Sequence, residues 1–230
     1  MVDFNFTVNT FCVSTLWNTN LTWYPQNGQP PDFTPCFHKT VLVYLPSLFI
    51  FVLSPIEFLR NNAPGTGNPI PWASLNILKL ILKLLLCCSV IFEEIVLALI
   101  VYNNKYPIVG ADFVGPAVKL SAYILSIILM FQAKKSGIVT SPPQWFYWLL
   151  HTVCQGFTFG SVVNNPYLTG LTWTVTQDVI VVFNFSCILL LLVLYSVAEK
   201  GQTYTKIQGI EITRHRIFLF GINRDALKYI

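Results

Sequence analysis

The chain has 230 residues, of which 54% are hydrophobic, 15% aromatic and only 10% charged. Because an ordinary soluble domain carries about 25% charged residues, this composition excludes a typical water-soluble fold and indicates a chain embedded in lipid. The formal net charge of +4 does not favour nucleic-acid binding, because retention of basic residues on one side of a membrane accounts for it.

The first 39 residues form a polar head without the pattern of a cleavable signal peptide. The opening "MVDFNFTVNTFCVSTLW" has no basic segment followed by an uninterrupted apolar core. We therefore expect the head, residues 1–39, to remain in the mature protein. It precedes a membrane region at 40–198 and a tail at 199–230.

Apolar windows that follow the head are long enough to cross a bilayer as α-helices. A helix needs about 20 apolar residues to span a hydrocarbon core of roughly 30 Å. The runs are continuous, as in "CILLLLVLYSV" (187–197), whereas a lipid-facing β-strand alternates. The sequence therefore predicts an all-α membrane protein, a bundle of five transmembrane helices near residues 40–59, 80–102, 108–131, 144–163 and 175–197.

The distribution of basic residues predicts which side of the membrane each terminus faces. An odd number of spans places the termini on opposite sides, and short cytoplasmic loops retain Lys and Arg. An extracellular N-terminus leaves only Lys39 and Lys105 in outer segments, with Lys119 inside the third span. The C-terminus is then cytoplasmic, with the other basic residues, namely Arg60, Lys79, Lys83, Lys134, Lys135, Lys200, Lys206, Arg214, Arg216, Arg224 and Lys228.

Cys12 and Cys36 are the cysteines that lie outside the predicted spans. In an oxidising compartment they pair, and a disulfide closing a loop of about 24 residues contributes on the order of 3 kcal/mol. The alternative is two free thiols. The remaining cysteines are interpreted as small buried hydrophobic residues: Cys87, Cys88, Cys154 and Cys187.

Two glycosylation acceptor motifs fall in the head, at Asn5 and Asn20. A third match, at Asn184, lies inside the fifth predicted span and is sterically unavailable. Because the charge distribution independently places the head outside, Asn5 and Asn20 are the predicted glycosylation sites.

Charged residues also occur at bilayer depth. Glu93 and Glu94 in the second predicted span and Lys119 in the third lie at similar distances from the outer span ends. Because such charges cost several kcal/mol unless paired or hydrated, we expect one glutamate to face Lys119. This ion pair either registers the two helices or belongs to a proton or ion pathway; alternatively, the glutamates are protonated or face a partner.

No catalytic, cofactor-binding or metal-binding motif is recognised. A phosphate-binding loop with Lys-Ser/Thr is absent, and His38, His151 and His215 fall in different segments. The cysteines lack Cys-x-x-Cys spacing. We therefore do not expect an enzyme. The basic tail either lies on an anionic membrane surface or is solvated.

The stretch "LWNTNLTWYPQNGQPPDFTPCFHKTVLVYLP" (16–46) resembles the N-terminus of multidrug resistance-associated proteins, the C subfamily of ABC transporters. In that family a Trp-flanked glycosylation site precedes Pro-Asp-Phe-Thr, Cys-Phe and Thr-Val-Leu-Val. The likeness continues more loosely through "SPIEFLR" (54–60), the acidic residue in the second span and Asp178. The resemblance implies the accessory five-helix domain that precedes the transport core, with its N-terminus outside and an N-terminal disulfide.

The resemblance also implies a function. Such a domain serves trafficking, retention in the plasma membrane and contact with an ABC core or another membrane protein, while the full-length family exports organic anions and conjugates using ATP. The tail after Lys200 does not match the family linker, so we expect a fragment or truncated isoform. The alternative is an independent small carrier or channel built around Glu93, Glu94 and Lys119.

Overall fold

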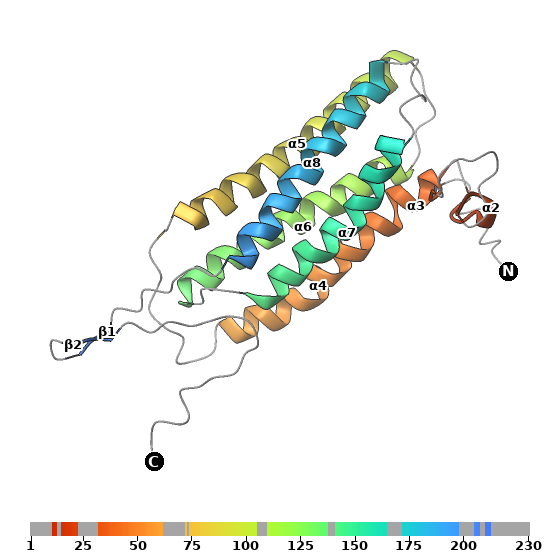
Figure 1. Cartoon of the computed structure of the whole chain (residues 1–230). Helices are drawn as coiled ribbons and strands as arrows, with labels where there is room; N and C mark the ends of the chain where they lie inside the picture. Colours follow the sequence, from red (N-terminus) through yellow and green to blue (C-terminus); the bar gives the residue numbers. More distant parts are fainter. Residues whose placement is uncertain are drawn as a thin grey trace.

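The computed structural model of the chain describes residues 11–12, 15–22, 32–61, 72, 74–104, 110–137, 141–164, 172–197, 205–207 and 210–212. The long helices among these residues are α4 (Val41–Asn61), α5 (Ser74–Asn104), α6 (Gly110–Lys135), α7 (Pro142–Asn164) and α8 (Thr172–Ser196). The short helices α2 (Thr19–Thr22) and α3 (Pro35–Lys39) precede them, and the short antiparallel strands β1 (Thr205–Ile207) and β2 (Ile210–Ile212) follow (Figure 1).

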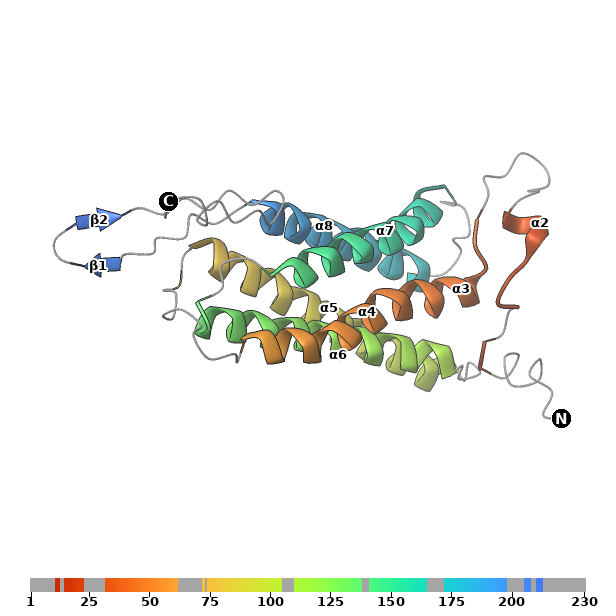
Figure 2. The same ribbon diagram turned by 90° about the horizontal axis from the view of Figure 1, so that it is seen from below.

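The long helices close into a ring in which each packs against two others. Helix α6 lies between α4 and α5, α7 lies between α4 and α8, and α5 contacts α8 to complete the ring. Short helices α2 and α3 lie at one end of the bundle, here called the head end, and β1 and β2 lie beyond the opposite, tail end (Figures 1 and 2). An odd number of helices thus separates the two ends of the described chain.

The core of the ring contains apolar and aromatic residues from every long helix. The buried cluster comprises Ile50, Leu82, Leu86, Cys87, Val90, Ala122, Tyr123, Leu129, Tyr147, Trp148, Cys187, Ile188, Leu191 and Leu194. Large apolar side chains such as Leu48, Phe92 and Val193 are exposed on the outside. Helices suit such an apolar exterior because each satisfies its own backbone hydrogen bonds without water.

The predicted all-α five-helix bundle is confirmed. By length and composition, the segments Pro35–Asn61, Gly110–Lys135 and Asp178–Ser196 could cross a membrane, and α5 and α7 pack beside them in the ring. Helix α5 begins at Ser74 rather than near residue 80. Lys79 and Lys83 lie within α5 and are buried, so neither is a loop residue, and their assignment to the cytoplasmic side stays a prediction.

Helix α6 approaches the start of α4 closely at Gly115. A Cβ atom on Gly115 would lie 2.9 Å from the backbone carbonyl oxygen of Lys39, a distance that side-chain carbons essentially never adopt. One turn earlier on α6, Asp112 forms an ion pair with the Lys39 ammonium group at 2.5 Å. The absence of a side chain at Gly115 therefore permits this helix contact, as small residues commonly do in membrane bundles.

We predict that Gly115→Ala lowers the midpoint of thermal unfolding in detergent. The added methyl group must push α6 away from the Lys39 carbonyl group. Gly160→Ala in α7 is the matched control, because its Cβ would meet nothing within 4 Å, and alanine favours a helix over glycine by about 1 kcal/mol. Equal midpoints for the two variants would contradict the proposed close contact.

Candidate functional site

Lys83 of α5 lies in the tail-end half of the ring with no exposed surface. Its ammonium group donates hydrogen bonds to the backbone carbonyl of Ser126 at 2.9 Å and to Oε1 of Gln144 at 3.3 Å. The same nitrogen lies 5.8 Å from the ring centroid of Trp148 and 5.2 Å from that of Tyr195. This single side chain therefore contacts α6, α7 and α8.

The partners of the Lys83 ammonium group also contact one another. Nε2 of Gln144 donates to the Ser126 carbonyl at 3.3 Å, and the Tyr195 hydroxyl donates to Oε1 of Gln144. Lys79, one turn before Lys83, lies 4.8 Å from the Tyr195 ring centroid. Desolvated cation–π contacts contribute about 2 kcal/mol. We call this set the lysine cluster: Lys79, Lys83, Ser126, Gln144, Trp148 and Tyr195.

A second polar contact joins α4 to α7 at the same end of the ring. The Glu57 side chain of α4 is fully buried, and its Oε1 accepts a hydrogen bond from Ser141, which directly precedes α7. Arg60 lies 3.5 Å from the same carboxylate oxygen. Glu57 also interacts electrostatically with Lys83. Glu57 and the lysine cluster together include residues of all the long helices.

Near the middle of the ring, the Tyr123 hydroxyl lies 2.8 Å from Nε2 of His151. The Tyr147 ring stacks on the His151 ring, with centroids 5.7 Å apart. Among the described residues, Nδ1 of His151 is buried without a hydrogen-bond partner. This pair links α6 to α7 and stands between the lysine cluster and the charged residues nearer the head end.

The predicted intramembrane charges lie on neighbouring helices. Lys119 of α6 is only 8% exposed, whereas Glu93 and Glu94 of α5 are half-buried. No ion pair joins these three residues within the described part of the chain. Glu93 is the carboxylate whose charge acts on Lys119, while Glu94 has Glu93 and Asp112 as charged neighbours. Pairing of a glutamate with Lys119 stays a prediction, and Glu93 is the better candidate.

At the head end, the structure places Cys12 and Cys36 at bonding distance. Their sulfur atoms are 2.09 Å apart and their Cα atoms 5.6 Å apart. Both cysteines are buried together with Ala111 of α6, and Phe11 packs against them. A disulfide here ties the head to α3 and to the beginning of α6.

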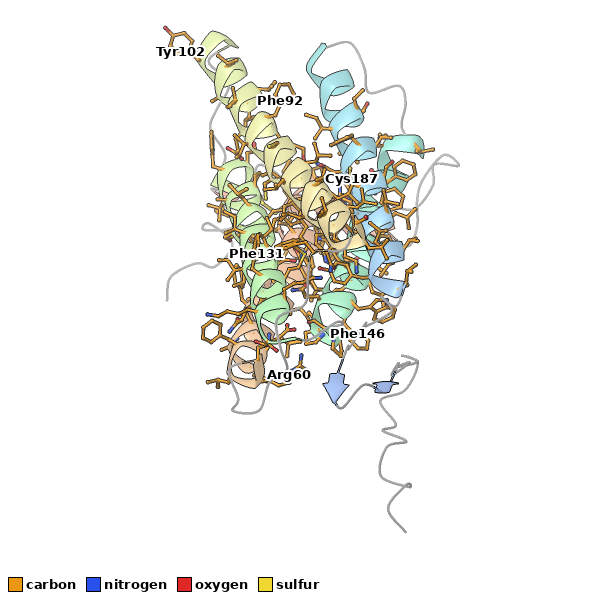
Figure 3. All side chains as sticks on the ribbon, turned by 90° about the vertical axis from the view of Figure 1, so that its left-hand side faces the viewer. Arg60, Phe92, Tyr102, Phe131, Phe146 and Cys187 are labelled. Carbon is orange, nitrogen blue, oxygen red and sulfur yellow. A yellow bond between two sulfur atoms is a disulfide. The ribbon has the colours of Figure 1, made fainter. Side chains whose placement is uncertain are left out.

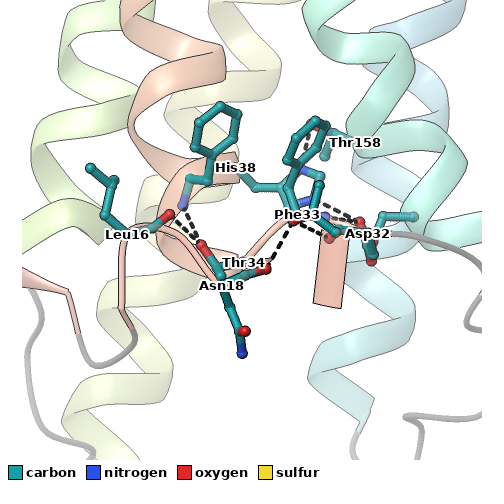
Figure 4. A network of polar contacts seen from close by, with 10 residues as sticks. Leu16, Asn18, Asp32, Phe33, Thr34, His38 and Thr158 are labelled. Carbon is teal, nitrogen blue, oxygen red and sulfur yellow. Dashed lines mark hydrogen bonds and ion pairs between the residues drawn. The ribbon is translucent and has the colours of Figure 1, made fainter. Parts of the chain in front are cut away.

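Polar contacts also hold the head against α7, as Figure 4 shows for several of these residues. Oδ2 of Asp32 accepts a hydrogen bond from Ser161 at 2.6 Å, and its Oδ1 lies 3.1 Å from Nε2 of His38. The other ring nitrogen of His38 lies 3.4 Å from the Thr158 hydroxyl. Thr34 caps the N-terminus of α3 by accepting a hydrogen bond from a backbone N–H.

The remaining predicted residues have different positions. Asn5 and most of the basic tail lie outside the described residues, and Asn20 lies in α2. Asn184 is buried, and its Oδ1 accepts a hydrogen bond from Ser89 at 2.5 Å. Cys87, Cys154 and Cys187 are buried as expected, whereas Cys88 is exposed and contradicts that expectation. Adjacent residues of one helix point about 100° apart, and this rotation turns Cys88 to the outside of the ring while Cys87 faces the core.

Sequence reasoning missed the lysine cluster, although a pattern indicated it. In "LKLILKLLL" (78–86), Lys79 and Lys83 are four residues apart and therefore share one helix face. Two cations on one face of an apolar helix need polar partners from neighbouring helices. Nothing in the sequence, however, identified Gln144 and Tyr195 as those partners.

The chemistry of the described residues is that of interhelical contacts. Buried ammonium, amide, hydroxyl and carboxylate groups bind one another across helix boundaries. In the described part of the chain, no group of three or more His, Cys, Asp or Glu residues is arranged to hold a metal ion. The geometry therefore favours fixing the relative positions of five helices.

A helical ring with an apolar exterior and interhelical contacts between buried polar groups defines an integral membrane domain. Residues 18–181 match the family model described as "ABC transporter TMD0 domain". Because this match covers more than half of the chain, the protein belongs to the family of ABC transporter TMD0 domains.

Similar curated proteins belong to sub-family C of the ATP-binding cassette proteins. Human member 3 is 27% identical over 152 residues, which cover 65% of this chain and 10% of that protein. Human member 2 is 23% identical over 198 residues, covering 84% of this chain and 12% of that protein. Mouse member 3 is 27% identical over 162 residues. The chain thus spans about a tenth of the length of these relatives.

We predict that Lys83→Met and Gln144→Leu each lower the free energy of unfolding by about 1–3 kcal/mol. Each change leaves a buried hydrogen-bond partner unsatisfied. The double variant should lose less than the sum of the single losses, with a coupling energy of about 1 kcal/mol or more. Unfolding by SDS in mixed micelles measures all three values.

Lys135→Met is the control for this cycle. Lys135 lies in the last turn of α6 and is exposed, so its loss should change the free energy by less than about 0.5 kcal/mol. Fully additive losses for Lys83→Met and Gln144→Leu would show that these two side chains do not interact.

Proposed function

We propose that this chain is an accessory membrane domain of a sub-family C ABC transporter, serving trafficking, membrane retention or contact with a partner. The family match over residues 18–181, with relatives that are about ten times longer, carries this proposal. ATP-driven export of organic anions and conjugates belongs to the transport core that such a domain accompanies. This chain contributes a rigid helical body to that assembly.

The rigidity follows from the contacts inside the ring. In lipid, apolar surfaces alone provide little force for helix association, so close packing and interhelical polar contacts matter more. The lysine cluster and the Glu57–Ser141 contact provide polar links at the tail end. The Asp32, His38 and Cys36 contacts provide them at the head end. A body fixed at both ends is suited to hold a partner in a constant orientation.

The proposed topology has residues 1–39 outside, residues 40–198 in the plasma membrane and residues 199–230 in the cytoplasm. The opposite positions of α3 and β1 at the two ends of the ring support it (Figure 1). In this orientation Cys12 and Cys36 occupy an oxidising compartment, and Asn5 and Asn20 are accessible to glycosylation. The tail end, with Arg60 and Lys135 exposed or half-exposed at the ends of α4 and α6, faces the cytoplasm.

Within the membrane, Lys119 is proposed to pair with Glu93 and thereby set the register of α5 against α6. Support comes from the burial of Lys119, from the contact between α5 and α6, and from the action of the Glu93 charge on the lysine. This structural role is preferred to an ion pathway because the described polar groups mainly contact one another across helices.

We predict that the full chain, co-expressed with a sub-family C transport core lacking its own TMD0, co-purifies with that core. The domain itself should produce no flux of organic anions in liposomes, because transport belongs to the core. The matched comparison is an unrelated five-helix membrane protein expressed at the same level. Anion flux from the purified chain, without association with a core, would instead establish the alternative, an independent small carrier or channel.

Glycosylation tests the proposed orientation. Wild-type chain from a glycosylating eukaryotic cell should lose mass on treatment with a glycosidase, and Asn5→Gln and Asn20→Gln should each remove one glycan. Ser186→Ala should change nothing, because Asn184 is buried in α8. Glycosylation of an acceptor motif introduced into the tail, with none in the head, would reverse the proposed topology.

A further inference from the structure

The face of α5 that packs into the ring becomes less buried towards the head end. Its residues at helical spacing are buried up to Val90: Lys79, Leu82, Lys83, Leu86, Cys87 and Val90. The next residues on this face, Glu93, Glu94 and Leu97, are only half-buried. In Figure 3, the Tyr102 end of α5 stands apart from the head-end part of α8. We call Glu93, Glu94 and Leu97 the open stretch of α5.

The charges around the open stretch do not balance. Asp112 is paired with Lys39 at 2.5 Å, and Glu93 is the carboxylate that acts on the buried Lys119. Glu94 is left with Glu93 and Asp112 as its charged neighbours, and both are acidic. Among the described residues, Oε1 of Glu94 is buried without a hydrogen-bond partner. Within the ranges that the structure describes, the Glu94 carboxylate therefore has no cation paired with it.

An unmatched carboxylate at bilayer depth is costly, and acyl chains cannot satisfy it. A transmembrane helix with a basic residue can satisfy the carboxylate, because it offers apolar surface to Leu97 and a basic side chain to Glu94. A second copy of this chain does not fit as well. Its described cation at this depth, Lys119, is only 8% exposed on α6 and already has Glu93 as its charged neighbour.

We propose that the open stretch of α5 docks a transmembrane helix of another polypeptide, which carries a Lys or Arg at the depth of Glu94. This inference rests on the proposed accessory role and identifies the surface through which that role is exercised. Glu94 forms the intermolecular ion pair, while Glu93 remains with Lys119 inside the domain.

The test uses the full chain, labelled with a donor fluorophore and reconstituted in phosphatidylcholine vesicles. Acceptor-labelled synthetic Leu/Ala transmembrane helices carry either one Lys at the depth of Glu94 or Leu at that position. Energy transfer should show about tenfold tighter association of the Lys helix. Glu94→Gln should reduce this preference to less than about twofold, and Glu93→Gln, the matched control, should retain most of it.

Equal association of the two helices with the wild-type chain would overturn the proposal. Loss of the preference in Glu93→Gln but not in Glu94→Gln would also overturn it. Unfolding midpoints of both variants near that of the wild type establish that the bundle is intact; a misfolded Glu94→Gln would be replaced by Glu94→Asp, which retains the charge and should retain the preference.

The two proposals fail separately. Co-purification with a transport core but no preference for the Lys helix would leave the accessory role and remove this docking surface. Preference for the Lys helix without co-purification would leave the docking surface and remove the accessory role.

Discussion

Burial of the Lys83 ammonium group inside an apolar ring is the constraint on which the arrangement of the helices depends. An unpaired charge at that position would cost many kcal/mol, so neighbouring helices must supply polar atoms within hydrogen-bond reach. Ser126 of α6 and Gln144 of α7 provide oxygen atoms, and Tyr195 of α8 provides an aromatic face. Few relative positions of four helices satisfy these contacts together, which makes the cluster a source of specificity as well as stability.

The two ends of the bundle are fixed by different chemistry. At the tail end, buried charges and amides connect the helices. At the head end, the Cys12–Cys36 pair and the contacts of Asp32 attach the polar head to α6 and α7. Between these ends, the open stretch of α5 carries two half-buried carboxylates at the edge of the outer surface. A firmly held body with a polar stretch on its outer surface matches the proposed role of an accessory domain that holds a partner.

The helices themselves could be predicted from the sequence, because continuous apolar runs and Gly/Pro/Asn-rich turns mark spans directly. The interior could not be predicted to the same degree. The positive-inside rule places Lys79 and Lys83 on the cytoplasmic side, but it does not identify their partners, which lie far away in the sequence. Gln144 follows two prolines and is the first residue of the predicted fourth span, where a polar residue gives no sign of burial. Cys88 was misplaced because hydrophobicity alone does not give the rotation of a helix about its axis.

Detection of the Lys83–Ser126 contact in a bilayer tests the central claim most directly. The chain would be labelled with ¹⁵N at lysine Nζ and ¹³C at serine carbonyl carbons and studied by solid-state NMR. A dipolar coupling that disappears in Lys83→Met would demonstrate an ammonium group held against the α6 carbonyl. A Lys83 Nζ signal without this coupling, exchanging freely with water, would contradict a ring built around a buried lysine.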